Sequence, residues 1–145
     1  MYFVDRKKIE NTLLYMEGLI QEYPHHDYTS FLEKLSLERL TQMTIESVID
    51  AGNMMIDGFI MRDPGSYEDI IDILVDEKVI PEEEEKAYKS FIQLRKPLVQ
   101  SYTEIEHTTL MDTWKATLPA IEQFSTRIRD YLDNELGPVS AFQNE

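Results

Sequence analysis

Apolar residues recur at intervals of three and four along most of the chain, and no segment alternates apolar and polar residues as a half-buried strand would. This spacing predicts helices that each bury one face. We therefore expect an all-α fold, an up-and-down helical bundle of four longer helices plus one or two short ones. The expected segments are residues 5–22, a short turn opened by Ser30, 37–61, 66–77, a helix from Pro81 into the 95–106 stretch, and 108–136.

Local signals predict where several helices begin and end. A serine followed three residues later by an acidic residue is a capping-box pattern. Gly137 and Pro138 are expected to stop the last helix, which leaves one domain over residues 1–138 and a frayed tail over 139–145. The capping pairs are Ser30–Glu33 and Ser66–Asp69, and Ser36 is expected to cap the helix over 37–61.

Composition narrows the classes of function. The chain has 14 Lys and Arg against 28 Asp and Glu, a net charge of −14, which repels nucleic acid at long range but leaves room for a local basic site. There is no cysteine, so disulfides, thiol catalysis and thiolate metal sites are excluded. No apolar run is long enough to span a membrane, and charged residues precede any long apolar region. We expect a cytoplasmic protein without membrane association.

No metal or cofactor is expected. His25, His26 and Asp27 are adjacent in a loop, and adjacent loop residues seldom converge on one metal ion, so a surface loop is the favoured interpretation. The chain has no glycine-rich phosphate loop, zinc pattern or serine-nucleophile motif.

Arg95 departs from the helical pattern. On a helical wheel it lies at the centre of an apolar side, where a guanidinium must be paired or must line a cleft. An arginine that reaches the surface or pairs with a core carboxylate, and an arginine with a functional role, both remain open. Pro97 is expected to bend this helix. The apolar neighbours on the wheel are Tyr88, Phe91, Ile92, Val99 and Tyr102.

Residues 95–106 read RKPLVQSYTEIE. The stretch resembles the motif Arg-Asn-x-Leu-Val-His-x-Tyr-x-x-Ile-Asp of the HepT-like family, within the HEPN superfamily of helical ribonucleases, and in particular its YutE-type branch. The resemblance extends upstream to IESVIDAGNMMI, DPGSYEDIIDIL and EKVIPEEEEKAY and covers roughly residues 5–132.

The resemblance implies a homodimer in which the motif arginine and histidine of two subunits line a shared cleft and cleave RNA without a metal. Family members are often toxins, encoded beside a minimal nucleotidyltransferase antitoxin that adds AMP to the motif tyrosine. Carried over, Arg95 binds phosphate and stabilises the transition state, and Tyr102 is the residue that accepts AMP.

Three positions depart from the family motif. Gln100 stands where the family has histidine, Lys96 stands where it has asparagine, and Pro97 has no counterpart. Glutamine does not titrate, so it cannot act as a general acid or base, and we expect weakened or altered cleavage. The alternatives are an inactive dimeric scaffold that binds a nucleotidyltransferase or RNA, and a structural helical protein, which pairing of Arg95 wholly inside one subunit would favour.

Other polar residues are candidate supports of the cleft. Glu46 and Asp50 share one side of the long helix, where they form a solvated face or pair with Arg95 in the dimer cleft. Lys96 is a further candidate support, although on the wheel it lies with Gln100 on a side typical of a solvated face. His107, the nearest histidine, lies outside the family spacing and is expected at the start of the last helix rather than as a replacement base.

Overall fold

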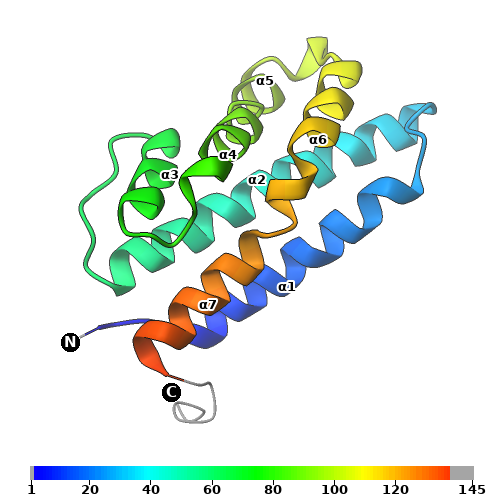
Figure 1. Ribbon diagram of the computed structural model, residues 1–145. Helices are drawn as coiled ribbons and strands as arrows, with labels where there is room; N and C mark the ends of the chain where they lie inside the picture. The colour runs from blue at the N-terminus through cyan, green and yellow to red at the C-terminus, as the bar shows by residue number, and fades with distance from the viewer. Residues whose placement is uncertain (1, 138–145) are drawn as a thin grey trace.

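The computed structural model describes residues 2–137, which contain helices and no strand (Figure 1). The predicted all-α fold is therefore confirmed, although the helices are more numerous and some are shorter than expected. The predicted tail, 139–145, lies outside the described residues. In chain order the elements are α1 (Arg6–Glu22), the 3₁₀ turn η1 (Tyr23–His25), α2 (Phe31–Gly58), α3 (Tyr67–Asp76), η2 (Glu82–Glu84), α4 (Glu85–Ile92), α5 (Arg95–Gln100), η3 (Tyr102–Glu104), α6 (His107–Ile121) and α7 (Phe124–Leu136).

The helices pack around the long helix α2 (Figure 1). α1 lies against α2. α3 packs on α2, and α4 packs on α3. α6 contacts both α2 and α4, and α7 contacts α1. One hydrophobic core joins these helices. Its largest fully buried side chains are Trp114, Tyr88, Phe91 and Phe124. Within residues 2–137, no helix has the length and apolar content needed to cross a bilayer.

The start of α2 combines a confirmed prediction with a wrong one. Ser30 and Glu33 form the predicted capping box, with the Glu33 amide donating to Ser30 Oγ over 3.1 Å. They open the whole of α2 rather than a short separate turn, and Ser36 lies inside the helix. No glycine or proline occurs between residues 31 and 50, so nothing interrupts the helix once it has begun.

The chain between Pro81 and Gln100 is divided in two. Pro81 precedes η2 instead of opening a helix, and α4 ends at Ile92 before α5 begins at Arg95. Pro97 has no amide hydrogen to donate to the carbonyl of Gln93, so the helix is interrupted there. The predicted bend is confirmed, and it lies just before Arg95.

The expected last helix is also two helices. α6 ends at Ile121 and α7 begins at Phe124, where the prediction was one continuous helix. Pro119 lies inside α6, lacks an amide donor and crowds the preceding turn. The break is marked by a 3₁₀-type hydrogen bond, in which the Gln123 amide donates to the Ala120 carbonyl over 2.9 Å. At its far end α7 stops before Gly137, which has a positive φ of 85°, as predicted.

Helix α3 sits close to α2 because Gly52 has no side chain. A methyl group added at Gly52 would lie 2.5 Å from Ile70 Cγ2, closer than packed carbon atoms approach. The missing side chain of Gly52 thus permits the close contact. This contact fixes the position of α3, whose first residues line the candidate site described below.

Arg129 ties α7 to α1. Its guanidinium donates to Glu10 at 2.7 and 2.9 Å and to Glu17 at 2.8 and 3.0 Å. The Arg129 hydrogen bonds lower the pKa of Glu17, against an opposing effect of burial. Because all three side chains are partly exposed, solvent screens the network, and its contribution stays modest.

We expect Arg129→Met to lower the free energy of unfolding by about 1 kcal/mol at pH 7. A lowered pKa in the folded state stabilises the fold above the unfolded pKa of the glutamate, about 4.3, and this stabilisation is lost as the pH falls through the lowered pKa. The difference between variant and native chain should therefore shrink in acid. Urea unfolding followed by circular dichroism at pH 7 and in acid measures it.

The matched control is Arg39→Met, because Arg39 is an exposed arginine without an ion pair among residues 2–137. Its unfolding free energy should stay within about 0.5 kcal/mol of the native value. A difference for Arg129→Met that stays constant from pH 7 into acid would contradict the role given to Glu17.

Candidate functional site around Arg95

A pocket of about 430 Å³ lies between the start of α3 and the segment from α4 to α5. It brings together three of the predicted site residues, Arg95, Lys96 and Gln100. Tyr67 and Glu68 from α3 line it as well. The motif and the DPGS turn, which are well separated in the sequence, therefore form one concave surface.

Arg95 is held on two sides. Its Nε donates to Glu46 Oε1 of α2 over 2.6 Å, and its guanidinium carbon lies 4.6 Å from the centre of the Tyr67 ring. The side chain is 28% exposed, so it is neither in the core nor free in solvent. Hydrogen bonding to Glu46 raises the pKa of Arg95, against an opposing effect of burial. These contacts fix the direction of the guanidinium without removing it from solvent.

The pairing with Glu46 leaves part of the guanidinium available. Arg95 Nη1 and Nη2 have no hydrogen-bond partner among residues 2–137, whereas Nε is occupied. Pairing of Arg95 wholly inside one subunit would favour the hypothesis of a purely structural protein, and here only Nε is paired. It does not exclude a functional role, because the two Nη groups retain the donor geometry that binds a phosphate.

The two acidic candidates on α2 differ in their contacts. Glu46 pairs with Arg95 within the chain, whereas the prediction placed such a pair in the cleft of a dimer and stays a prediction. Asp50 is exposed and forms no hydrogen bond with Arg95. Partial desolvation and then the charge of Glu46 raise the pKa of Asp50. Lys96 is exposed and lines the pocket beside Arg95, so the pocket carries two cations on its α5 side.

Gln100 and Tyr102 follow Arg95 on the exposed side of the molecule. Gln100 is the last residue of α5 and lines the pocket, while Tyr102 begins η3 and is 69% exposed. Val99 is 40% exposed, so the prediction that Val99 and Tyr102 continue the apolar side was wrong. The interruption before Arg95 and the end of α5 change the helical phase, and only Tyr88, Phe91 and Ile92 of that side are buried.

The histidines lie away from this pocket. His107 is the first residue of α6, as predicted, and its Nε2 lies 2.7 Å from Glu38 Oε2. His26 Nε2 lies 2.6 Å from Glu22 Oε2 on the exposed side of the loop after α1. Across residues 2–137 no three side chains of the metal-binding types gather into a cluster.

Sequence reasoning missed Tyr67 and Glu68 as site residues. The pair Ser66–Asp69 predicted the start of α3, which is confirmed by a 3.0 Å bond from the Asp69 amide to Ser66 Oγ. That signal is local, so it could place a helix start but could not place it beside α5. Only the packing of α3 against α2 and α4 brings these side chains to Arg95.

The fold and the motif define a class of protein. Residues 9–128 match the family described as ribonuclease HepT-like, and the chain belongs to that family. The similarity to its YutE branch is confirmed as well. The chain is 51% identical over 144 residues to "Putative RNase YutE" of Bacillus subtilis (strain 168), a match that covers 99% of this chain and 100% of the relative.

Solved structures have the same fold. One, described as a cytosolic protein of unknown function, YutE from Bacillus subtilis, has a TM-score of 0.94 and 51% identity and covers 97% of this chain and 99% of its own. Another, described as a toxin-antitoxin with AMP-PNP, has a TM-score of 0.75 and 20% identity and covers 84% of this chain and 97% of its own. At that identity the second match shows a common fold.

Proposed function

We propose that this chain is a metal-independent endoribonuclease and the toxin component of a toxin-antitoxin pair. The observation that carries the proposal is the orientation of Arg95. Glu46 holds its Nε, while its two Nη groups have no partner within residues 2–137 and the side chain lines an open pocket with Lys96 and Gln100. A guanidinium fixed in this way is suited to a phosphate diester.

The chemistry follows from what each side chain can do. In metal-free RNA cleavage the 2′-hydroxyl attacks the adjacent phosphorus and the 5′-oxygen leaves, and negative charge builds up on the phosphate oxygens between these events. Without a histidine, water takes the proton of the 2′-hydroxyl and returns one to the 5′-oxygen. Arg95 stabilises that charge through fixed donors, and Lys96 adds a second cation. Gln100 can hold a phosphate or a water molecule by hydrogen bonds but cannot transfer a proton, so cleavage by this chain is slow.

The assembly that we propose is a homodimer with the Arg95 clefts of two subunits facing each other, bound by a minimal nucleotidyltransferase antitoxin that adds AMP to Tyr102. The exposed ring of Tyr102 supports this, since a modifying enzyme needs access to its hydroxyl. The fold shared with a structure described as a toxin-antitoxin with AMP-PNP is in keeping with such a partner. We also propose a cytoplasmic location, in keeping with the description of the YutE relative as cytosolic.

Gln100 itself favours a second candidate function. A pocket that keeps the arginine but has glutamine in place of the motif histidine is what an inactive relative would retain. In this alternative the chain is a dimeric scaffold that binds a nucleotidyltransferase or RNA without cutting it. The two functions differ in one measurable property, the cleavage of RNA.

The test is cleavage of a labelled RNA pool by the purified chain with a chelator present. The native chain should cut slowly, and Arg95→Ala should cut about 100-fold more slowly, because the fixed donors to the transition state are lost. Gel separation of the products over time gives both rates. Arg39→Ala is the matched control, since it also removes an exposed arginine and should cut at the native rate.

Equal cleavage by Arg95→Ala and the native chain would overturn the role of this pocket. Cleavage that stops when the chelator is added would overturn the metal-independent mechanism. No cleavage by the native chain would favour the scaffold instead, provided that thermal melting shows the chain to be folded.

A further inference from the structure

The pocket beside Arg95 has two chemically different walls. The α5 wall carries the cations Arg95 and Lys96, whereas the α3 wall carries the aromatic ring of Tyr67 and the carboxylate of Glu68. Gln93 lines the pocket as well and is exposed. The phosphate chemistry proposed above uses the α5 wall and gives no role to Tyr67, Glu68 or Gln93.

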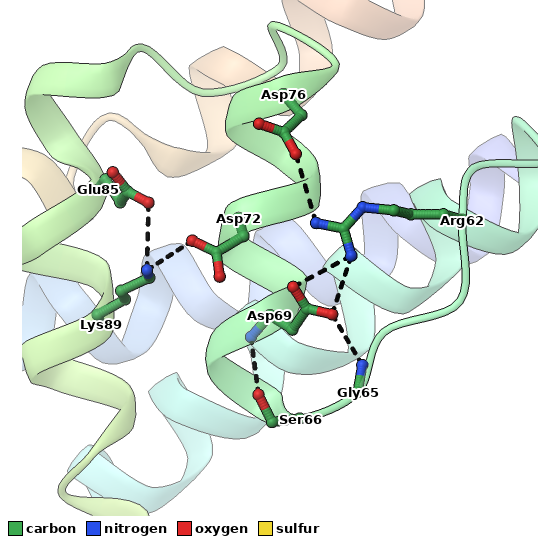
Figure 2. A network of polar contacts seen from close by, with 8 residues as sticks. All are labelled: Arg62, Gly65, Ser66, Asp69, Asp72, Asp76, Glu85 and Lys89. Carbon is green, nitrogen blue, oxygen red and sulfur yellow. Dashed lines mark hydrogen bonds and ion pairs between the residues drawn. The ribbon is translucent and has the colours of Figure 1, made fainter.

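Tyr67 is an exposed aromatic ring on a fixed support. The ring is 46% exposed, although Arg95 lies against it. Figure 2 shows what holds the turn before it, with Asp69 accepting from the Gly65 amide at 2.8 Å and pairing with Arg62 at 3.0 Å, while Ser66 caps the helix. A rigid, open aromatic ring beside a phosphate-binding group is suited to stacking on a nucleobase.

The rest of α3 is fixed in the same way. Lys89 of α4 pairs with Asp72 at 2.5 Å and with Glu85 at 3.1 Å, and Arg62 reaches Asp76 at 3.3 Å (Figure 2). These links join α3 to α4 and to the chain that leaves α2. The α3 wall therefore keeps its position relative to Arg95 before any ligand arrives, and less ordering is needed on binding.

Glu68 determines what can lie on the α3 wall. It is half-buried, lines the pocket and has no hydrogen-bond partner among residues 2–137. A carboxylate repels a phosphate, so the phosphate belongs at Arg95 and Lys96 and a neutral group belongs at Glu68. A carboxylate also only accepts hydrogen bonds, so that neutral group must present donors.

Among the four RNA bases, guanine fits this arrangement. Its Watson–Crick edge places two donors side by side, N1–H and the 2-amino group, next to the acceptor O6. Glu68 can accept from both donors, and the Gln93 amide can donate to O6. Adenine, cytosine and uracil each have a ring nitrogen acceptor or a carbonyl where guanine has its second donor, and that atom would face the carboxylate.

We infer that the α3 wall is a nucleobase subsite, in which Tyr67 stacks on the base next to the bound phosphate and Glu68 with Gln93 selects guanine. The inference rests on the proposed function, because it takes the ligand of the Arg95 pocket to be RNA. It adds that cleavage occurs beside guanine, with the base chosen by α3 and the phosphate held by α5.

Calorimetric titration with guanosine 3′-monophosphate and adenosine 3′-monophosphate tests the subsite without requiring cleavage. The native chain should bind the guanosine nucleotide about 10-fold more tightly. Glu68→Gln should remove that preference, because an amide presents a donor where guanine also has one. Glu83→Gln is the matched control, an exposed glutamate outside this pocket, and should keep the preference.

Two variants of Tyr67 separate stacking from other roles of the ring. Tyr67→Phe keeps the ring and should bind both nucleotides as the native chain does. Tyr67→Ala should weaken both about 10-fold while leaving the melting temperature near that of Tyr67→Phe. Equal binding by Tyr67→Ala and Tyr67→Phe would overturn the stacking role.

The outcomes separate this inference from the proposed function. A guanosine preference that depends on Glu68 supports the subsite even if the native chain cuts no RNA. Cleavage that depends on Arg95, with equal binding of the two nucleotides and no excess of guanine at the mapped cut sites, overturns the subsite and leaves the ribonuclease intact.

Discussion

Gln100→His is expected to raise the rate of RNA cleavage by about 10²- to 10⁴-fold. Gln100 ends α5 and lines the Arg95 pocket, so a histidine there would lie beside the phosphate that we propose Arg95 binds. Histidine titrates near neutral pH and can take the proton of the 2′-hydroxyl or return one to the leaving oxygen, which glutamine cannot do. The variant should also acquire a pH dependence with a pKa of about 6.5.

The measurement is single-turnover cleavage of labelled RNA between acid and neutral pH, with a chelator present. Val99→His is the matched control, because it places a histidine in the same pocket, one position before Gln100, at a residue with no role in binding. Its rate should stay at the native level. Adding Arg95→Ala to Gln100→His should remove the gain, since a proton carrier without the phosphate-binding group has no substrate to act on.

Equal or slower cleavage by Gln100→His, with an active native chain, would contradict this prediction. It would mean that the native chain transfers the protons by another route, for which Gln100 supplies hydrogen bonds. A large gain would instead show that the rest of the site is assembled and that one residue limits the chemistry.

Trp114→Ala is expected to lower the free energy of unfolding by about 3–5 kcal/mol. Trp114 is fully buried on α6 and stacks on Tyr23 at 4.3 Å between ring centres, with Phe91 edge-on at 4.9 Å. Its Nε1 donates to Thr41 Oγ1 over 2.8 Å. One side chain therefore joins α6 to η1, α4 and α2, and alanine would leave a large cavity among them.

Urea unfolding followed by circular dichroism measures this change. Tryptophan fluorescence cannot be used, because the variant removes the single tryptophan of the chain. Such a loss is a large share of the roughly 5–15 kcal/mol that stabilises a typical domain. Tyr102→Ala is the control for removal of an aromatic ring, because Tyr102 is 69% exposed and should change stability by less than about 0.5 kcal/mol. A loss below about 1 kcal/mol for Trp114→Ala would contradict the central role given to this side chain.

The features that could be predicted from the sequence are those with local causes. The periodic apolar positions predicted helices, and the pairs Ser30–Glu33 and Ser66–Asp69 predicted two helix starts that the structure contains. Two of the errors came from proline. Pro119 was not recognised as the cause of a break, and the break near Pro97 lies before Arg95, so the helical wheel assigned Val99 and Tyr102 to the wrong side.

The candidate site was predicted in part. The order and spacing of the motif identified the family and Arg95, because residues within one short segment keep their spacing whatever the rest of the chain does. The choice of Glu46 rather than Asp50 as the partner of Arg95 depended on which turn of α2 faces α5, and helical spacing allowed both.

The sequence by itself determined the all-helical fold, the family, and the presence of Arg95 together with Gln100 in place of the motif histidine. The tertiary structure decided that Arg95 keeps two Nη groups without a partner among residues 2–137, and that Tyr67 and Glu68 line its pocket. The physical reason is that caps, periodicity and motifs depend on neighbours within a few residues. The Arg95 pocket depends on how α2, α3 and α5 pack, and that packing is set by contacts between distant segments such as Gly52 with Ile70.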